Sequence, residues 1–439
     1  MEVVRAESLA HEIVARLRAA GHQAWLVGGC VRDLLLGIPP KDFDIATDAR
    51  PEQLLSIFPR SGQVGAHFGV VLVRDDEAQV EVATFRSDQE YHDGRRPTAV
   101  HFETDPRADV LRRDFTINGL MMDPSNGAVL DFVDGRADIE RGVVRAIGDP
   151  GARFREDHLR MLRAVRFAAR LGFTIDASTL EAIRENRAAI GRVSAERVRD
   201  ELVRILTEGG ARRGFELLDE TGLLQELLPE VAAMKGVEQP PQYHPEGDVW
   251  THTLLLLQRL DHPTPELAAG ALLHDVGKPP TFRIADRIRF DGHAELGAGM
   301  AREILGRLRF SRESTERVEA LVANHMRFKD VGRMKPSTLK RFLRMPQFEE
   351  HLELHRLDCL AGAGMLDNYE LAQQKLHEIP EEQLRPARLI GGEELIAAGY
   401  RPGKQFSEIL AAVEEAQLEG SITTPEEAME MVRRQFPLS

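Results

Sequence analysis

The sequence predicts an α+β fold, with a mixed N-terminal region of strands and helices followed by helical regions. Short apolar runs typical of strands alternate with helical segments over residues 1–145. From about residue 150 onward, apolar residues recur at helical spacing, as in the segment REDHLRMLRAVRFAAR. The chain has 439 residues, which is too long for one ordinary core, so we expect two to four domains.

The first predicted strand ends in a pair of glycines. Trp25, Leu26 and Val27 form a short apolar run, and Gly28 and Gly29 follow directly. Glycine lets the backbone turn sharply and bring its N–H groups against a ligand. An apolar, helix-like segment that contains Arg32 comes next. The segment therefore predicts a strand, a ligand-binding turn and a helix.

Two carboxylates flank Phe43 in a second predicted strand, over residues 42–46. Because residues two apart on a strand share a face, Asp42 and Asp44 point into one site. Paired carboxylates repel each other unless a cation lies between them, and Mg²⁺ is held in this way together with substrate phosphates. Taken singly, such short motifs are usually a solvated surface or a turn. In this order they resemble the nucleotidyltransferase site of the DNA polymerase β superfamily, which implies a third carboxylate on a neighbouring strand; Glu81, in the predicted strand over residues 79–85, fits that role.

An arginine-rich triplet follows a polar segment that is poor in strand signals. Arg112, Arg113 and Asp114 precede residues 115–123, which we expect to form an apolar helix. A guanidinium at such a helix start can bind a phosphate or a ribose. A charged helix start is the simpler interpretation of the triplet alone.

Four charged residues step by three along a strongly predicted helix. Residues three apart share a helix face, so Asp157, Arg160, Arg163 and Arg166 lie together. An Asp accepts a hydrogen bond from an exocyclic amino group, and an Arg donates to ring acceptors. This edge admits cytosine and adenine and rejects uracil and guanine, with discrimination of roughly 1–3 kcal/mol for each good bidentate pair. Ordinary salt bridging explains most such pairs, but four such residues along one helix, directly after the predicted transferase site, favour nucleotide selection.

The charge of the chain is unevenly distributed. The formal net charge is −14, yet residues 141–213 carry sixteen arginines, no lysine and ten acidic residues, a local balance of +6. An acidic protein with one arginine-rich stretch can hold a polyanion at that surface. This distribution predicts an RNA partner.

A set of histidines and aspartates that could bind a metal lies in the C-terminal half. Imidazole and carboxylate groups in the order H…HD…D suit several divalent metals. The candidate ligands are His252, His274, Asp275, His293, His325 and Asp358. We assign His22, His158 and His351 to ordinary packed positions.

The motifs GGCVRD, DFD, RRDFTING, REDHLR and ERVRDEL resemble, in this order, those of class II tRNA nucleotidyltransferases and bacterial poly(A) polymerases. The resemblance spans about the first half of the chain. It implies a polymerase-β-like head followed by neck, body and tail helices that hold RNA, with CTP and ATP as substrates and two Mg²⁺ ions assisting the displacement of pyrophosphate. It also implies that residues 86–112 contain the loop that permits A addition. The implied roles are catalysis for Asp42, Asp44 and Glu81, nucleotide binding for Gly28, Gly29, Arg32, Arg113, Asp157, Arg160, Arg163 and Arg166, and bracing of the neck for Glu196 and Arg197.

The C-terminal candidate ligands resemble those of the HD metal-dependent phosphohydrolase superfamily. The resemblance implies a site for Mg²⁺ or a divalent transition metal, with hydrolysis of a phosphate ester as a hypothesis. We therefore expect a head over residues 1–145, a neck and body over 146–240, an HD domain over 241–365 and a helical tail over 366–439. Only two cysteines, Cys30 and Cys359, are present, which fits a reducing cytoplasm, and neither a membrane span nor a signal peptide is expected.

The sequence favours template-independent addition of C and A to tRNA 3′ ends. Two alternatives stay open. One is an A-only tRNA nucleotidyltransferase or a poly(A) polymerase, because its selector would be nearly the same. The other is an HD phosphohydrolase whose N-terminal half only binds RNA, although such a module has no need of paired carboxylates.

Overall fold

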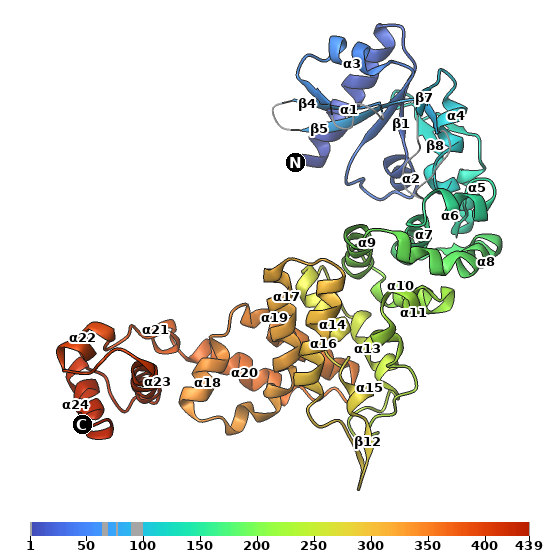
Figure 1. Ribbon diagram of the computed structural model, residues 1–439. Helices are drawn as coiled ribbons and strands as arrows, with labels where there is room; N and C mark the ends of the chain where they lie inside the picture. The colour runs from blue at the N-terminus through green and yellow to red at the C-terminus, as the bar shows by residue number, and fades with distance from the viewer. Residues whose placement is uncertain (1, 64–68, 76–77, 89–99, 439) are drawn as a thin grey trace. The chain divides into compact units, whose positions relative to one another are not determined.

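The computed structural model describes residues 2–63, 69–75, 78–88 and 100–438 (Figure 1). The chain divides into two compact units. Unit 1 is Met1–Ala232 together with Arg307–Phe310, and unit 2 is Ala233–Gly306 together with Ser311–Ser439.

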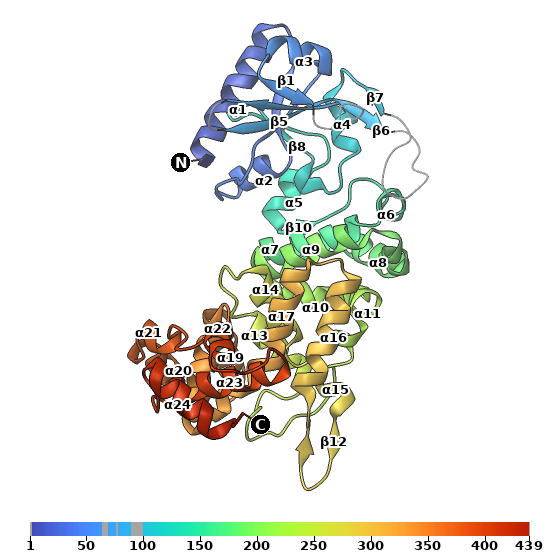
Figure 2. The ribbon, with the colours of Figure 1, turned by 60° about the vertical axis from the view of Figure 1, so that its left-hand side comes forward.

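A mixed sheet forms the N-terminal part of unit 1. Its strand order over the described residues is β3-β4-β5-β2-β1-β8-β9, and only the β2–β5 pair is parallel. Helix α1 packs against β1, β2 and β5, and Figure 2 shows it running along the sheet. The apolar core on the sheet is built by Val27, Ala46, Phe85, Val110 and Met121. The elements of this region are α1 (Glu2–Ala19), β1 (Ala24–Val27), α2 (Gly29–Leu35), β2 (Asp44–Thr47), α3 (Pro51–Ile57), β3 (Ser61–Gln63), β4 (Val70–Arg74), β5 (Gln79–Thr84), β6 (Arg86–Asp88), β7 (Val100–Phe102), α4 (Pro106–Leu111), η2 (Thr116–Asn118), β8 (Leu120–Met122), β9 (Val129–Asp131), α5 (Gly135–Arg141) and β10 (Val143–Val144).

The expected apolar helix after the arginine triplet is wrong. Residues 116–118 form the 3₁₀ turn η2, and β8 follows as a strand that pairs with β1, Leu26 opposite Met122. Gly119 lies so close to its neighbours that an added Cβ would be 2.8 Å from Cγ2 of Val133. Sheet pairing and this tight turn override the apolar pattern, which periodicity alone does not assign to helix or strand in so short a run.

The second predicted strand is shorter than expected. Strand β2 begins at Asp44, so Asp42 precedes the strand instead of lying in it. Of the segment expected to permit A addition, residues 89–99 lie outside the described part of the chain.

Helices make up the rest of unit 1. Helix α7 packs against α9 and α10. The predicted helix that joins Asp157 to Arg160 is wrong, because α6 ends at Glu156 and α7 begins at Arg160. Asp157 itself is extended, with φ −144° and ψ 105°. The elements are α6 (Pro150–Glu156), α7 (Arg160–Leu171), β11 (Thr174–Ile175), α8 (Ala177–Asn186), η3 (Arg187–Arg192), α9 (Ala195–Thr207), α10 (Ala211–Thr221), α11 (Leu223–Leu227) and α12 (Pro229–Ala232).

Unit 2 is helical apart from one short hairpin, β12–β13, which Figure 1 shows projecting from its helices. Helix α14 packs against α13, α17 and α19. The elements are α13 (Val249–Leu257), α14 (Pro265–Leu273), α15 (Lys278–Thr281), β12 (Arg283–Ile284), β13 (Ile288–Arg289), α16 (His293–Arg307), α17 (Arg312–Asn324), η4 (His325–Arg333), α18 (Pro336–Leu343), α19 (Phe348–Ala361), α20 (Asp367–Glu378), α21 (Glu381–Leu384), α22 (Gly392–Ala397), α23 (Lys404–Leu418) and α24 (Pro425–Gln435).

The last helices of unit 2 have small cores of their own. One core centres on Phe328, Phe342 and Phe348, and the other, at the C-terminal end, contains Leu395 and Ile409. Within the described residues, no helix combines the length and the apolar character that crossing a lipid bilayer requires.

Candidate active site and candidate metal centre

A cavity of about 600 Å³ in unit 1 brings together most of the predicted transferase residues. Charged side chains dominate its lining, and arginine is the commonest among them. Ten predicted residues line it: Gly28, Gly29, Arg32, Asp42, Asp44, Arg113, Asp157, Arg160, Arg163 and Arg166.

The Gly-Gly turn at the edge of the cavity requires glycine at its first position. Gly28 has φ 74°, a conformation that strains other residues, and it precedes the first residue of α2. A Cβ on Gly28 would lie 3.1 Å from Nη1 of Arg113. The absence of that atom lets the Arg113 guanidinium approach the turn, where both can face one ligand.

The carboxylates lie beside this turn. Phe43 is 2% exposed and anchors the segment, while Asp42 and Asp44 line the cavity. Asp44 on β2 pairs in register with Glu81 on β5, although Glu81 itself does not line the cavity. Burial, together with the charges of Asp42 and Glu81, raises the pKa of Asp44 to about 7. Such mutual repulsion is relieved by a divalent cation, so these oxygen donors fit Mg²⁺.

Arg32, Arg112 and Arg113 are three of the arginines that line the cavity. Arg32 is 2% exposed and donates from Nη1 to Oδ1 of Asn118 over 2.6 Å. Arg112 and Arg113 both donate to the buried Asp109, over 2.6 Å and 3.0 Å. Although burial opposes it, the two guanidinium groups lower the pKa of Asp109, which stays ionised. These hydrogen bonds hold the three guanidinium groups in fixed orientations without a bound ligand.

The arginines predicted to select the nucleotide are each held by a partner outside their own helix. Arg163 donates from Nε to Oδ2 of Asp114 over 2.8 Å, and Arg166 donates to the buried Glu201 over 2.6 Å. Arg160 donates to Glu156 over 2.6 Å.

Asp157 is fixed at both carboxylate oxygens. Its Oδ1 accepts from the backbone N–H of Leu159 over 3.1 Å, and its Oδ2 accepts from Nη2 of Arg197 over 2.8 Å. Arg197 therefore contacts Asp157 directly and lines the same cavity. Glu196, which is predicted to brace the neck together with Arg197, is exposed.

Sequence reasoning missed several residues of the cavity. Asp114 and Asn118 belong to the same RRDFTIN segment as Arg113, which is the signal that could have identified them. Asp33, Arg112 and Leu159 likewise belong to the motifs GGCVRD, RRDFTING and REDHLR, and the others lie outside the motifs. The additional lining residues are Asp33, Lys41, Arg112, Asp114, Asn118, Leu159, Phe167, Arg170, Arg204 and Glu208. Arg197, predicted only to brace the neck, lines the cavity as well.

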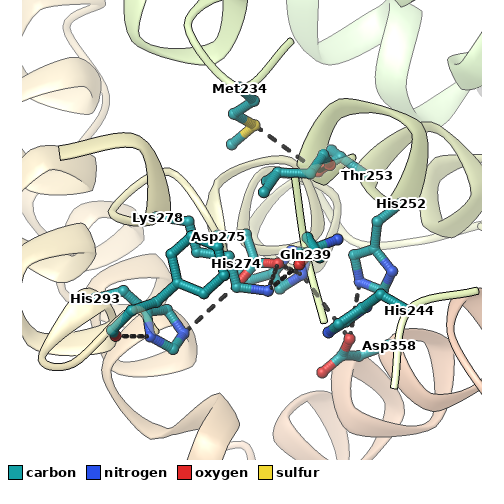
Figure 3. A network of polar contacts seen from close by, with 12 residues as sticks. Met234, Gln239, His244, His252, Thr253, His274, Asp275, Lys278, His293 and Asp358 are labelled. Carbon is teal, nitrogen blue, oxygen red and sulfur yellow. Dashed lines mark hydrogen bonds and ion pairs between the residues drawn. The ribbon is translucent and has the colours of Figure 1, made fainter. Parts of the chain in front are cut away.

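Unit 2 contains a separate buried cluster of imidazoles and carboxylates (Figure 3). His252, fully buried on α13, has its Nε2 2.9 Å from Oδ1 of Asp358 on α19. His274 lies at the end of α14, with its Nε2 4.0 Å from the same Asp358 oxygen. That nitrogen is buried and has no hydrogen-bond partner among the described residues.

Asp275 joins the other half of the cluster. Its Oδ1 lies 3.7 Å from Nε2 of His293 and 3.7 Å from Nε2 of His325. The Nδ1 atoms of His293 and His325 contact the carbonyl oxygens of Phe290 and Val322, so their Nε2 atoms are left to face the centre. Burial lowers the pKa of His325 to about 4, which keeps the imidazole neutral as a metal ligand must be.

All six predicted ligands are therefore brought together, and their donor atoms fit one or more divalent cations. Four residues of this network escaped prediction: Gln239, His244, Glu246 and Lys278. Lys278 donates to Oε1 of Gln239 over 2.6 Å and lies 2.7 Å from Oδ2 of Asp275. Glu246 contacts both His244 and His252.

The histidines assigned to packing differ in their partners. His158 is buried with Nδ1 2.7 Å from the carbonyl oxygen of Phe154, and His22 is paired with Asp48. His351 is buried, but its Nδ1 has no hydrogen-bond partner among the described residues.

Known proteins match the chain along most of its length. The family description "Poly A polymerase head domain" matches residues 24–145, "Probable RNA and SrmB- binding site of polymerase A" matches 172–235, and "HD domain" matches 248–362. The CCA-adding enzyme of Bacillus pumilus is 41% identical over 249 residues, which are 56% of this chain and 62% of that protein. The CCA-adding enzyme of Enterococcus faecalis is 31% identical over 422 residues, covering 95% of this chain and 93% of that protein.

A solved structure shows the same arrangement. The crystal structure of the Bacillus stearothermophilus CCA-adding enzyme in complex with CTP matches with a TM-score of 0.74 and 28% identity, and the match covers 97% of each chain. With the cavity, its carboxylates and these full-length similarities in place, the chain belongs to the family of CCA-adding enzymes, which are tRNA nucleotidyltransferases.

Proposed function

We propose that this chain adds C and A nucleotides to the 3′ end of tRNA, from CTP and ATP and without a nucleic-acid template. The observation that carries the proposal is that one cavity holds two elements of different chemistry. Asp42 and Asp44 supply the charge that a metal-assisted transfer needs, and Asp157 and Arg160 supply a hydrogen-bonding edge for a base. Relatives named CCA-adding enzymes, among them one solved with CTP, support it.

Different residues of the cavity would bind the triphosphate, the base and Mg²⁺. Arg32 and Arg113, beside the Gly28–Gly29 turn, would hold the triphosphate, because guanidinium groups match phosphate oxygens. Asp157 would accept from the amino group that cytosine and adenine share, while uracil and guanine would present a carbonyl oxygen to its carboxylate. Mg²⁺ held by Asp42 and Asp44, with Glu81 as the neighbouring carboxylate, would neutralise the triphosphate and assist ionisation of the RNA 3′-hydroxyl.

Product lengths on defined acceptors test the proposal. Transfer RNAs that end before the first C, after one C and after two are each incubated with a single nucleotide. We expect C on the first two acceptors, A only on the third, and no incorporation of U or G. Addition of A alone would favour the A-only reading, and long A tails on unrelated RNA would favour a poly(A) polymerase.

A matched variant separates catalysis from RNA binding. Asp42→Asn keeps the shape of the side chain and removes its charge, so we expect addition to stop while the affinity for tRNA stays close to that of the unaltered protein. Full activity of Asp42→Asn would exclude the assigned role. It would then favour the alternative in which unit 1 is only an RNA-binding module.

For unit 2, we propose a divalent metal centre that hydrolyses a phosphate ester. The supporting observation is that the buried His252, His274 and Asp275 lie beside the partly exposed Asp358 and are joined by His293 and His325. The buried Nε2 of His274, 3.2 Å from Oδ2 of Asp275, has no hydrogen-bond partner among the described residues. Imidazole-rich sites suit Mn, Fe, Ni or Zn. His274→Ala should abolish metal binding and any phosphatase or phosphodiesterase activity while sparing nucleotide addition.

A further inference from the structure

We propose that Glu246 is a positioning residue of the metal centre in unit 2, which fixes the ring of His252 so that its Nε2 faces the metal. The inference rests on the proposed metal centre and adds a residue outside its six ligands. His252 is fully buried between two carboxylates. Its Nδ1 lies 2.6 Å from Oε1 of Glu246, and its Nε2 lies 2.9 Å from Oδ1 of Asp358.

The two nitrogens of one imidazole point in different directions, and this decides the role of Glu246. The Nε2 side faces Asp358 and the ring of His274, whose centroid is 5.4 Å away. The Nδ1 side faces Glu246. A cation bound to Nε2 is therefore on the far side of the ring from Glu246. Glu246 influences that cation through His252 and is not one of its ligands. With its proton on Nδ1 donated to Glu246, His252 offers the Nε2 lone pair to the metal.

The carboxylate is well placed to orient a ring, because it is buried and its loop is held. The Glu246 side chain is 6% exposed, and its Oε2 has no hydrogen-bond partner among the described residues. The backbone N–H of His244 donates to the carbonyl of Pro240 over 3.0 Å, and the N–H of Ala363 donates to the carbonyl of Tyr243 over 3.2 Å. The second contact ties the loop to the residues just after α19, the helix that carries Asp358.

His244 uses the same carboxylate oxygen. Its Nδ1 lies 2.9 Å from Oε1 of Glu246, and its ring packs edge-on against His252, 4.8 Å between centroids. Figure 3 shows His244 beside His252 and Asp358. One carboxylate oxygen thus receives two imidazoles, so the orientation of His252 is set by a contact network that spans the loop and α13.

Metal affinity of the full chain tests the inference. The protein carries Asp42→Asn and Asp44→Asn, which removes the transferase carboxylates, and it is titrated with Ni²⁺ by calorimetry. Glu246→Gln should weaken Ni²⁺ binding about 10–100-fold, the range for loss of a carboxylate behind a histidine ligand. The matched control is Glu303→Gln, an exposed carboxylate on α16, which should leave the affinity unchanged.

A second measurement needs no variant and reads the tautomer directly. In protein labelled with ¹⁵N-histidine and loaded with Zn²⁺, His252 should carry its proton on Nδ1, with that resonance shifted downfield by the charged acceptor. A proton on Nε2, or equal Ni²⁺ affinities for Glu246→Gln and the background protein, would overturn the positioning role. If the background protein binds no Ni²⁺ and His252→Ala changes nothing, the metal centre itself is refuted, which is a different outcome.

Discussion

Loss of the contact between Arg197 and Asp157 should weaken the discrimination of CTP and ATP from UTP and GTP. Arg197 Nη2 lies 2.8 Å from Oδ2 of Asp157, and the two side chains are 24% and 16% exposed. A hydrogen bond to a charged group contributes about 1.5–3 kcal/mol, and partial exposure places this pair near the lower end. Arg197→Met removes the contact and keeps much of the apolar stem.

Loss of about 1.5 kcal/mol corresponds to roughly a tenfold fall in kcat/KM for CTP and ATP. Because UTP and GTP gain nothing from a well-placed Asp157, their incorporation should fall less, so selectivity should erode. Asp157→Ala should erode it further, by roughly 5–150-fold, if the carboxylate discriminates by about 1–3 kcal/mol.

Single-turnover addition to tRNA ending before the first C, with each nucleotide separately, measures these ratios. The matched control is Arg199→Met on the same helix, because Arg199 pairs with Asp200 and does not line the cavity. Equal CTP-to-UTP ratios for Arg197→Met, Arg199→Met and the unaltered protein would refute the reasoning.

Three other predictions concern unit 1. Burial opposes the ionisation of Asp114, but Arg163 and Asn118 outweigh it and lower its pKa to about 2; Asp114→Asn should therefore lower the free energy of unfolding by about 2 kcal/mol at neutral pH. This stabilisation is complete above the pKa of Asp114 in the unfolded chain and is lost as pH falls from about 4 towards 2. In urea unfolding, the difference in free energy of unfolding between the unaltered protein and Asp114→Asn should therefore shrink only below about pH 4. A difference that stays constant down to pH 3 would contradict this assignment. Gly28→Ala should destabilise the protein by about 1–3 kcal/mol and raise KM for ATP, whereas Gly29→Ala, whose Cβ would meet only Arg32 Nη2 at 3.7 Å, should do neither. Burial raises the pKa of Cys30 to about 12, so a thiol reagent near pH 8 should label it only after denaturation, and rapid labelling of the folded protein would argue against a closed core there.

Local sequence patterns predicted the parts of the site that depend on neighbouring residues. The alternation of Asp42, Phe43 and Asp44 predicted two carboxylates on one side and an apolar ring on the other. Asp42 and Asp44 both line the cavity and Phe43 is buried, although Asp42 precedes strand β2. The Gly-Gly turn followed for the same reason, since a positive φ at Gly28 needs glycine.

Patterns failed where a contact distant in sequence decides the local conformation. The spacing of Asp157 and Arg160 predicted one continuous helix, but Asp157 caps the Leu159 N–H and reaches Arg197, forty residues further along the chain. Asp157 makes both contacts as an extended residue between α6 and α7. The i,i+3 pattern therefore grouped residues that do line one cavity, but a shared helix face is not what brings Asp157 beside Arg160.

In the proposed metal centre, too, the candidate ligands were predictable from residue type, whereas Glu246 was not. Histidine and aspartate in an H…HD…D order predicted candidate ligands, and the structure brings these residues together in one cluster. Glu246 gave no such signal, since a glutamate in a proline-rich loop is ordinarily solvated. Its contact with His252 arises because the loop is tied to the residues after α19, which places a carboxylate behind the ring whose other nitrogen faces Asp358. Residues that bind a ligand can thus be identified by their type, whereas those that orient them are found only from the fold that surrounds them.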